Sequence, residues 1–246
     1  MSRNVEVLLR ANETAQLFGQ KSNTEKSLKA VRPCMRPDPA AGAEEAELVQ
    51  RVFLLPVREE PHVVVFCGIG RVDGAGDICA RAGQNLASQT GASVCVVEGD
   101  FHSPYLHQYF GVGNSRGLAD ALLESGPIRD FLHPLPGSNL SVLPAGCNSE
   151  KIQALWNAER LRRRMEELRT EFSYVVVYGP QLSLLVDAML LGQMADGVIL
   201  ILESMVTRRE TARRAKENLV AANVKILGAV LNNHSFSIPE TLYKKV

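Results

Sequence analysis

Short apolar segments without polar alternation recur along this chain from position 62 onward, and they constrain its fold more than any other feature. Strands of this kind are buried on both faces, which is typical of a parallel sheet covered by helices. The expected strands are 62–68, 92–100, 139–146, 173–180, 196–202 and 225–233, and the expected helices are 76–89, 118–124, 154–171, 186–194 and 208–222. This alternation predicts a doubly wound α/β fold with a mainly parallel sheet and helices on both faces.

The two ends of the chain differ from this alternating part. Residues 1–31 carry a weak helical pattern, and the stretch "VRPCMRPDPAAGAEEAE" that follows is rich in Pro, Ala and charge, as in a linker that opens into a helix near Ala43. We therefore expect an N-terminal extension and linker at 1–43, one α/β domain at 44–234 and a C-terminal tail at 235–246.

Composition excludes several classes of protein. Lys plus Arg and Asp plus Glu both number 27, so the total charge gives no reason to expect a nucleic-acid partner or an anionic membrane. The basic run Glu159–Arg169 has interleaved acids and is expected to form a solvated, salt-bridged helix face.

The five cysteines lack paired spacing, which argues against a metal cage, and Cys67 and Cys95 are expected to be buried. No run approaches the roughly 18 apolar residues that span a bilayer, so a cytoplasmic protein is expected.

A glycine-rich loop follows the first expected strand, in the stretch Val63–Ala87 that reads "VVVFCGIGRVDGAGDICARAGQNLA". Strand, loop and helix in this order outline a phosphate-binding loop, in which backbone N–H groups and a helix N-terminus hold phosphate. A loop of the G-x-x-x-x-G-K-[ST] type ends in a lysine and a hydroxyl. The candidate nucleotide-binding residues here are Gly70, Arg71, Gly74, Gly76, Asp77 and Ile78.

Asp77 takes the place of the loop lysine and carries the opposite charge. Two unit charges about 5 Å apart interact by roughly 3 kcal/mol at an effective dielectric constant of about 20. Replacing attraction by repulsion therefore costs a bound nucleotide about two decades of affinity or more. The sequence indicates a loop shaped for phosphate that lacks the means to hold it.

Two alternatives to a degenerate phosphate loop stay open. An unusual but working ATPase would use Arg71 or Arg81 instead of the lysine, since a guanidinium can meet a phosphate through two hydrogen bonds. A dinucleotide site is the other alternative, because Gly68 follows a strand and Glu98 ends the next one. Asp73, however, stands where the third glycine of G-x-G-x-x-G belongs.

Several segments farther along the chain carry a family resemblance. They read "VCVVEGDFHSPYLHQYFGV", "NLSVLPAG", "VDAMLLGQMADGVILIL", "SMVTRRETARRAKENL" and "GAVLNN". Their order and spacing, from about Glu47 to Asn233, resemble the deviant P-loop ATPases of the MinD/ParA superfamily, and most closely the cytoplasmic bacterial tyrosine kinase domains of exopolysaccharide and capsule synthesis. The resemblance implies a P-loop NTPase-like fold and a family ligand of ATP or ADP with Mg²⁺.

The resemblance also assigns roles to residues at the strand ends. Glu98 and Asp100 stand where the family's second acidic motif has two aspartates, so they are the candidate metal ligands, and Asp100 is the catalytic candidate if the chain is active. His102 replaces that motif's arginine. Tyr178 replaces the acid that orients magnesium, and a phenol offers no negative charge to a cation at neutral pH. Asn232 matches the family position that contacts the nucleotide base.

Simpler roles fit some of these residues equally well. Asp100 is also a suitable loop-stabilising acid, and Asn232 is also a suitable cap for a strand end. His102 and His107 are expected to be solvent-exposed polar residues. The family's oligomerisation helix has the pattern E-x-x-R-x-x-R, but from Glu47 this chain reads "ELVQRVF", without the two arginines.

The residue replacements predict a catalytically impaired pseudo-kinase, a regulatory or scaffolding component of bacterial exopolysaccharide synthesis. The resemblance implies a membrane-anchored polysaccharide co-polymerase as partner, association with the membrane through that partner, and a homo-oligomer as a further assembly. No cofactor is expected on this interpretation. The alternatives are an active ATP-dependent tyrosine kinase or ATPase with a rearranged loop, and a nucleotide sensor without catalysis.

Overall fold

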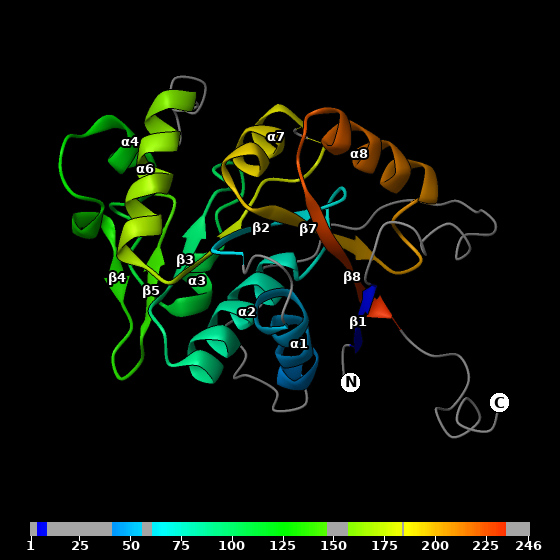
Figure 1. Ribbon diagram of the computed structural model, residues 1–246, viewed down its shortest axis with the longest axis horizontal. Coiled ribbons are helices and arrows are strands. Elements are labelled where there is room, and N and C mark those ends of the chain that lie inside the picture. The colour runs from blue at the N-terminus through cyan, green and yellow to red at the C-terminus, as the bar shows by residue number, and fades with distance from the viewer. Residues whose placement is uncertain (1–3, 9–40, 56–60, 147–156, 184, 235–246) are drawn as a thin grey trace.

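The computed structural model describes residues 4–8, 41–55, 61–146, 157–183 and 185–234, and within them the strands form one sheet (Figure 1). Its strand order is β1-β8-β7-β2-β6-β3-β5-β4. The strands are β1 (Asn4–Leu8), β2 (Val63–Gly68), β3 (Val94–Glu98), β4 (His133–Pro134), β5 (Leu140–Leu143), β6 (Tyr174–Tyr178), β7 (Gly197–Glu203) and β8 (Ile226–His234). The strands from β8 to β5 in this order are all parallel, and β1 and β4 are antiparallel edge strands.

Helices cover both faces of the sheet, which confirms the predicted doubly wound α/β fold (Figure 1). One layer consists of α1 (Ala41–Val49), the π-helical turn η2 (Gln50–Leu54), α2 (Ala75–Thr90) and α3 (Leu106–Phe110). The other layer consists of α4 (Leu118–Leu123), the short 3-10 helix η3 (Ile128–Phe131), α6 (Ala158–Glu171), α7 (Leu185–Met194) and α8 (Arg209–Ala221). None of the helices that the structure describes is long and apolar enough to cross a bilayer.

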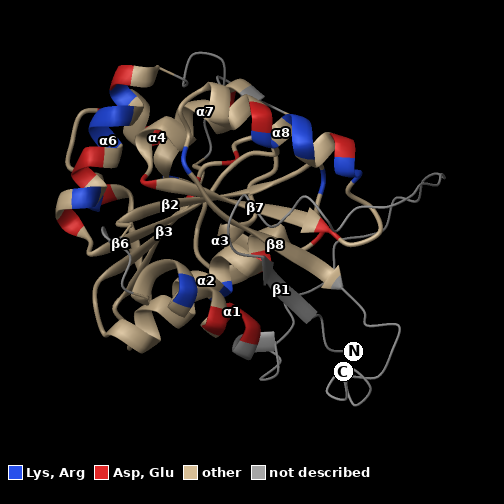
Figure 2. Ribbon diagram, turned by 45° about the vertical axis from the view of Figure 1, so that its right-hand side comes forward, with Lys and Arg blue, Asp and Glu red and all other residues tan. Residues whose placement is uncertain are grey.

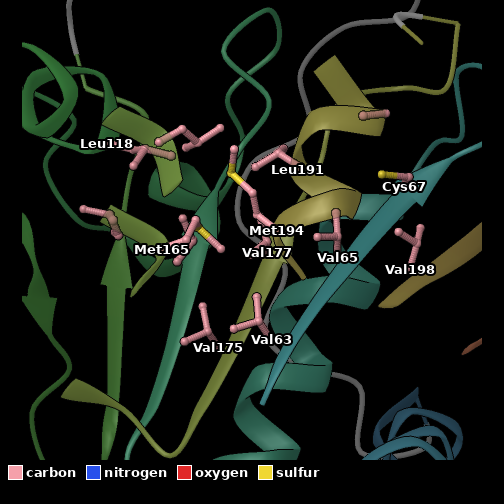
Figure 3. Packing of buried hydrophobic residues seen from close by; sticks show 14 of the residues in the cluster. Val63, Val65, Cys67, Leu118, Met165, Val175, Val177, Leu191, Met194 and Val198 are labelled. Carbon is pink, nitrogen blue, oxygen red and sulfur yellow. The ribbon is translucent and has the colours of Figure 1, made fainter. Parts of the chain in front are cut away.

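Burial on both faces explains the absence of polar alternation in the central strands. In β2 the side chains of Val63, Val65 and Cys67 enter the core beneath the α6 and α7 layer, and Figure 3 shows them near Leu191 and Met194 of α7. The alternate residues Val64 and Phe66 enter the second core, beneath α2. Because each face buries its own set of side chains, both sets must be apolar.

The structure corrects the prediction at the N-terminus. Residues 4–8 lie within the weak helical pattern at 1–31, but they form β1, which pairs antiparallel with β8. The helical interpretation is therefore wrong for this segment, since backbone pairing to the sheet edge prevails over a weak local periodicity. The rest of 1–31, the stretch 154–156 and the tail 235–246 lie outside the described residues. Strand β4 and helices α3 and η3 are short elements that the sequence analysis did not predict.

The basic run of α6 is also more than a solvated face. Arg164 is buried, and its guanidinium donates hydrogen bonds of 2.7, 2.8 and 2.7 Å to the carbonyl oxygens of Ala121, Glu124 and Gly126. These carbonyls belong to the end of α4 and the turn after it, where helix carbonyls lack partners within the helix. Arg164 therefore joins α6 to the C-terminal end of α4, whereas its neighbour Arg163 is exposed.

Substitutions of Arg164 and Arg163 compare a buried arginine with an exposed one in the same helix. Arg164→Ala should lower the free energy of unfolding by about 3 kcal/mol, because it leaves three buried carbonyl oxygens without a charged donor. Arg163→Ala removes the same side chain from an exposed position and should change the value by about 0.5 kcal/mol or less. Urea unfolding followed by circular dichroism measures both. Equal effects of the two substitutions would contradict the structural role of Arg164.

Candidate functional site

The carboxyl ends of β2, β3, β6, β7 and β8 meet at one edge of the sheet, where parallel α/β folds bind ligands. The glycine loop lies there between β2 and α2. Gly70 and Gly74 have φ angles of +75° and +87°, a region that favours glycine. Asn232 Nδ2 donates to the Asp73 carbonyl at 2.7 Å, and the Asp73 N–H donates to Glu203 Oε2 at 3.2 Å. The loop is thus tied to the ends of β7 and β8.

Tyr105 occupies the space next to the loop's last glycine. A Cβ atom added to Gly76 would lie 2.3 Å from the Tyr105 ring, so the ring packs directly against the backbone of α2's first turn. The Tyr105 hydroxyl donates a hydrogen bond to the carboxylate of Asp77. Burial, together with Asp77, raises the pKa of Tyr105, so the phenol stays a neutral donor. Tyr105 and Asp77 therefore form a contact at the place of the family's lysine.

Ile78 follows Asp77 where the phosphate loop has a magnesium-binding hydroxyl. Its side chain is fully buried in the core beneath α2, together with that of Cys79. An aliphatic side chain donates no ligand to a cation. This position therefore serves the packing of α2 against the sheet.

Glu98 ends β3 with a fully buried side chain. Its Oε2 atom accepts the N–H groups of Tyr105 and Leu106 at 2.7 and 2.8 Å, and its Oε1 atom accepts the Asp100 N–H at 3.3 Å. Burial outweighs these hydrogen bonds and raises the pKa of Glu98 to about 8. Glu98 thus holds the start of α3, including Tyr105, and at neutral pH its carboxyl is mostly protonated.

Asp100 stabilises its own loop. Its Oδ1 atom accepts the N–H groups of His102 and Ser103 at 2.9 and 3.2 Å, the pattern of an Asx turn. Burial raises the pKa of Asp100. His102 is partly exposed, with its Nε2 atom 3.5 Å from Asp187. His107 differs from the expected exposed residue, because its Nδ1 atom is buried without a hydrogen-bond partner and burial lowers its pKa.

Tyr178 stands beside Glu98 in the sheet, because the two residues are register partners on β6 and β3. Burial, and then the nearby Glu98 and Asp100, raise the pKa of Tyr178, so its hydroxyl stays neutral. Neither this phenol nor the protonated Glu98 provides the charge that a divalent cation requires. Among the described residues, no group of three or more His, Cys, Asp or Glu side chains forms a metal site.

The two arginines considered as substitutes for the lysine have different environments. Arg81 donates from Nε and Nη2 to Glu45 Oε1, each at 2.7 Å, and Glu45 of α1 is fully buried. Arg81 is thus committed to joining α1 and α2. The Arg71 side chain is 83% exposed and lies 3.6 Å from Asp73. Of this pair, Arg71 is the arginine with freedom to move.

Sequence analysis missed Tyr105 and Glu45. Tyr105 meets Asp77 across 28 residues, and Glu45 meets Arg81 across 36, so neither pair leaves a local pattern in the chain. The nearest signal for Tyr105 was its position directly after Pro104, where a short helix begins.

A magnesium-bound nucleotide does not fit the residues around this loop. Asp77 repels phosphate, the Tyr105 ring fills the space against Gly76, and Ile78 supplies no ligand. Asn232, the candidate for the base, is buried and holds the loop instead. The structure brings the candidate residues to one edge, but it engages Asp77, Glu98, Asp100 and Asn232 in contacts of the protein's own.

Comparison with known proteins finds sequence relatives among bacterial tyrosine kinases. The chain is 29% identical over 156 residues to tyrosine-protein kinase YwqD of Bacillus subtilis, a match that covers 62% of this chain and 66% of that protein. It is 23% identical over 181 residues to tyrosine-protein kinase CpsD of Streptococcus agalactiae, covering 73% and 78%. The chain is thus similar in sequence to bacterial tyrosine-protein kinases. No family model matches it.

Two solved structures share the fold of this chain. The chimerical protein CapA2B2 superposes with a TM-score of 0.73 at 21% identity, covering 81% of this chain and 87% of that one. The MinD cell division protein of Aquifex aeolicus superposes with a TM-score of 0.59 at 19% identity, covering 75% and 72%. The match to the Bacillus kinase spans just under two thirds of that protein's length.

The proton on Glu98 predicts a pH dependence of stability. Between about pH 4.5 and 8 the unfolded chain has released this proton and the folded chain still holds it, so the free energy of unfolding falls as pH rises through this window. Glu98→Gln removes this contribution. Since a shift of one pKa unit corresponds to roughly 1.4 kcal/mol, the contribution is a few kcal/mol at most. The wild-type value should therefore decline more steeply from pH 5 to 8 than that of the variant.

Urea unfolding at several pH values measures this difference. Glu166→Gln, at an exposed position of α6, is the matched control and should keep the wild-type slope. Parallel curves for the wild type and Glu98→Gln would show that Glu98 is ionised in the folded chain at neutral pH.

Proposed function

We propose that this chain is a catalytically impaired pseudo-kinase that acts as a regulatory or scaffolding component of bacterial exopolysaccharide synthesis. The contact between Asp77 and Tyr105 at the lysine position carries the proposal. In phosphoryl transfer a lysine, a positioned Mg²⁺ and an oriented nucleophile act together, and the loop has an acid in place of the first. The homology to capsule and exopolysaccharide kinases supports the biological setting.

The loss of charge is concentrated in the nucleotide site, whereas the fold around it is intact. Apolar strands, turn glycines and amphipathic helices remain mutually consistent, as expected of a chain that folds to one state. We therefore propose that the protein acts by binding other proteins through its surface and not by catalysis, since a catalytic site can be lost while the fold persists. Its proposed partner is a membrane-anchored polysaccharide co-polymerase, through which it reaches the membrane.

Family-type assembly into a ring has little support from α1 and η2. At the two arginine positions of the family's oligomerisation pattern, Gln50 is exposed and Phe53 is buried, with its ring 5.8 Å from that of Tyr174. Phe53 thus contributes to the core of the monomer. We propose that any homo-oligomer uses a different surface.

Calorimetric titration with ATP and ADP, with and without magnesium, tests the loss of nucleotide binding. The wild-type chain should give no saturable heat up to about 1 mM ligand. The reason is the acid at position 77, which by the charge argument lowers nucleotide affinity by about two decades or more relative to a loop with lysine there. Asp77→Lys reverses the charge in the loop and should bring measurable binding. Asp73→Lys makes the same change in charge at a neighbouring residue whose side chain is 82% exposed, and should bring much less.

The same titration decides between this proposal and the enzyme alternative. Micromolar, magnesium-dependent binding by the wild type would overturn the proposal and would direct attention to Arg71 as the substitute cation. In that case ATP turnover should be measurable, and Asp100→Asn should abolish it. Saturable binding without any product would favour the nucleotide sensor.

A further inference from the structure

The turn between β7 and α8 presents two apolar side chains to solvent. Met205 is fully exposed and Val206 is 65% exposed, although they are neighbours at the carboxyl edge of the sheet. We call residues 205–206 the apolar tip. Exposed apolar side chains scattered singly are common on protein surfaces, whereas adjacent ones form a contiguous apolar patch, the kind of feature that marks interaction sites.

Hydrogen bonds hold the backbone of this turn in place. The N–H groups of Val206 and Thr207 both donate to the Glu203 carbonyl, at 3.2 and 2.9 Å, and the Glu203 N–H donates to Thr207 Oγ1 at 2.8 Å. The Ser204 N–H donates to the Asn232 carbonyl of β8 at 2.9 Å. The apolar tip is therefore displayed on a fixed support.

Met205 has a φ angle of +62°, in the left-handed region that glycine and asparagine adopt at lower cost. A side chain that makes no packing contact does not repay this cost within the chain. Backbone strain retained at an exposed position is a reason to look for function there. The choice of methionine, flexible and polarisable, suits contact with an adaptable apolar environment.

A basic helix begins directly after the apolar tip. Positions 205–217 contain five basic and two acidic residues, an excess of three positive charges in a chain whose total charge is zero. Arg208, Arg209, Arg213 and Arg214 are exposed, and Figure 2 shows basic and acidic residues along α8. Arg213 and Arg214 form exposed ion pairs with Glu217 and Glu210. The opposite face of α8 is anchored in the core by Ala215 and Leu219. The basic side chains therefore extend from the apolar tip along the exposed side of a helix that is anchored in the core.

From this arrangement we propose that the apolar tip and the exposed arginines of α8 form a docking site for an anionic lipid surface. Met205 and Val206 enter the boundary between headgroups and acyl chains, and the guanidinium groups remain among the anionic headgroups. A bilayer is favoured over an acidic protein because it accepts both the apolar pair and the cations that follow it on α8. This inference does not depend on the proposed pseudo-kinase role, and it would hold equally for a chain that binds nucleotide.

Co-sedimentation of the full chain with lipid vesicles tests the proposal. Vesicles of phosphatidylcholine with about one third phosphatidylglycerol should bind the chain, and vesicles of phosphatidylcholine alone should not. Raising the salt from about 0.1 to 0.5 M should release most of the bound chain, because it screens the arginines. Binding that is equal on both kinds of vesicle, or absent from both, would overturn the proposal.

Variants with matched controls separate the two parts of the site. Arg208→Glu with Arg213→Glu should weaken binding at least tenfold, whereas Arg162→Glu with Arg163→Glu makes the same change in net charge on exposed positions of α6 and should have little effect. Met205→Ser with Val206→Ser should weaken binding several-fold, and Val220→Ser, at an exposed position near the other end of α8, should not.

The outcome with the apolar tip decides the class of partner. If Met205→Ser with Val206→Ser binds anionic vesicles as well as the wild type does, nothing inserts and the proposal is wrong. If the α6 pair weakens binding as much as the α8 pair, the attraction is general and the proposal is wrong. Circular dichroism of each variant confirms that it is folded before binding is compared.

Discussion

Burial of both faces of the parallel strands is the constraint from which the site and its surroundings follow. Val64 and Val65 of β2 enter opposite cores, so the strand interior has no position for a polar side chain. The polar residues of the candidate site therefore lie at the carboxyl ends of the strands or in the loops that follow them. Glu98 ends β3, Asn232 lies near the end of β8, and Asp100 and the glycine loop follow β3 and β2.

At that edge the protein satisfies its polar groups internally. Glu98 accepts three backbone N–H groups, and by doing so it places Tyr105 where the ring packs on Gly76 and the hydroxyl reaches Asp77. A carboxyl that remains protonated near neutral pH and a phenol that remains neutral replace the charges that hold magnesium in the family. Tyr105 therefore both fills the space beside Gly76 and supplies a hydrogen-bond donor to the carboxylate of Asp77.

The turn after β7 lies at the same edge of the sheet, but there apolar side chains are exposed to solvent. There the side chains of Met205 and Val206 project into solvent, and basic residues follow them on α8. Asn232 takes part in both regions, because its side chain holds the glycine loop and its carbonyl holds the turn at Ser204. Asn232 thus connects the glycine loop with the turn that carries Met205 and Val206.

The amino-acid sequence by itself determined the parallel α/β fold, the order of its main elements and the identity of the strand-end residues. These depend on local periodicity and on apolar runs, which every strand and helix carries within its own segment. The phosphate-loop pattern indicated the charge reversal at Asp77, and the family resemblance added the expected roles of the strand-end positions. Even the buried state of Cys67 and Cys95 could be predicted, because each lies inside an apolar run.

Only the tertiary structure decided how those residues are used. The contacts of Asp77 with Tyr105 and of Arg81 with Glu45 join segments far apart in the chain. Arg164 is buried although Arg162 and Arg163, in the same charged run, are exposed. The strand at 4–8 became visible only through its pairing with β8. Such outcomes depend on which segments pack side by side, and local sequence patterns contain no record of long-range packing.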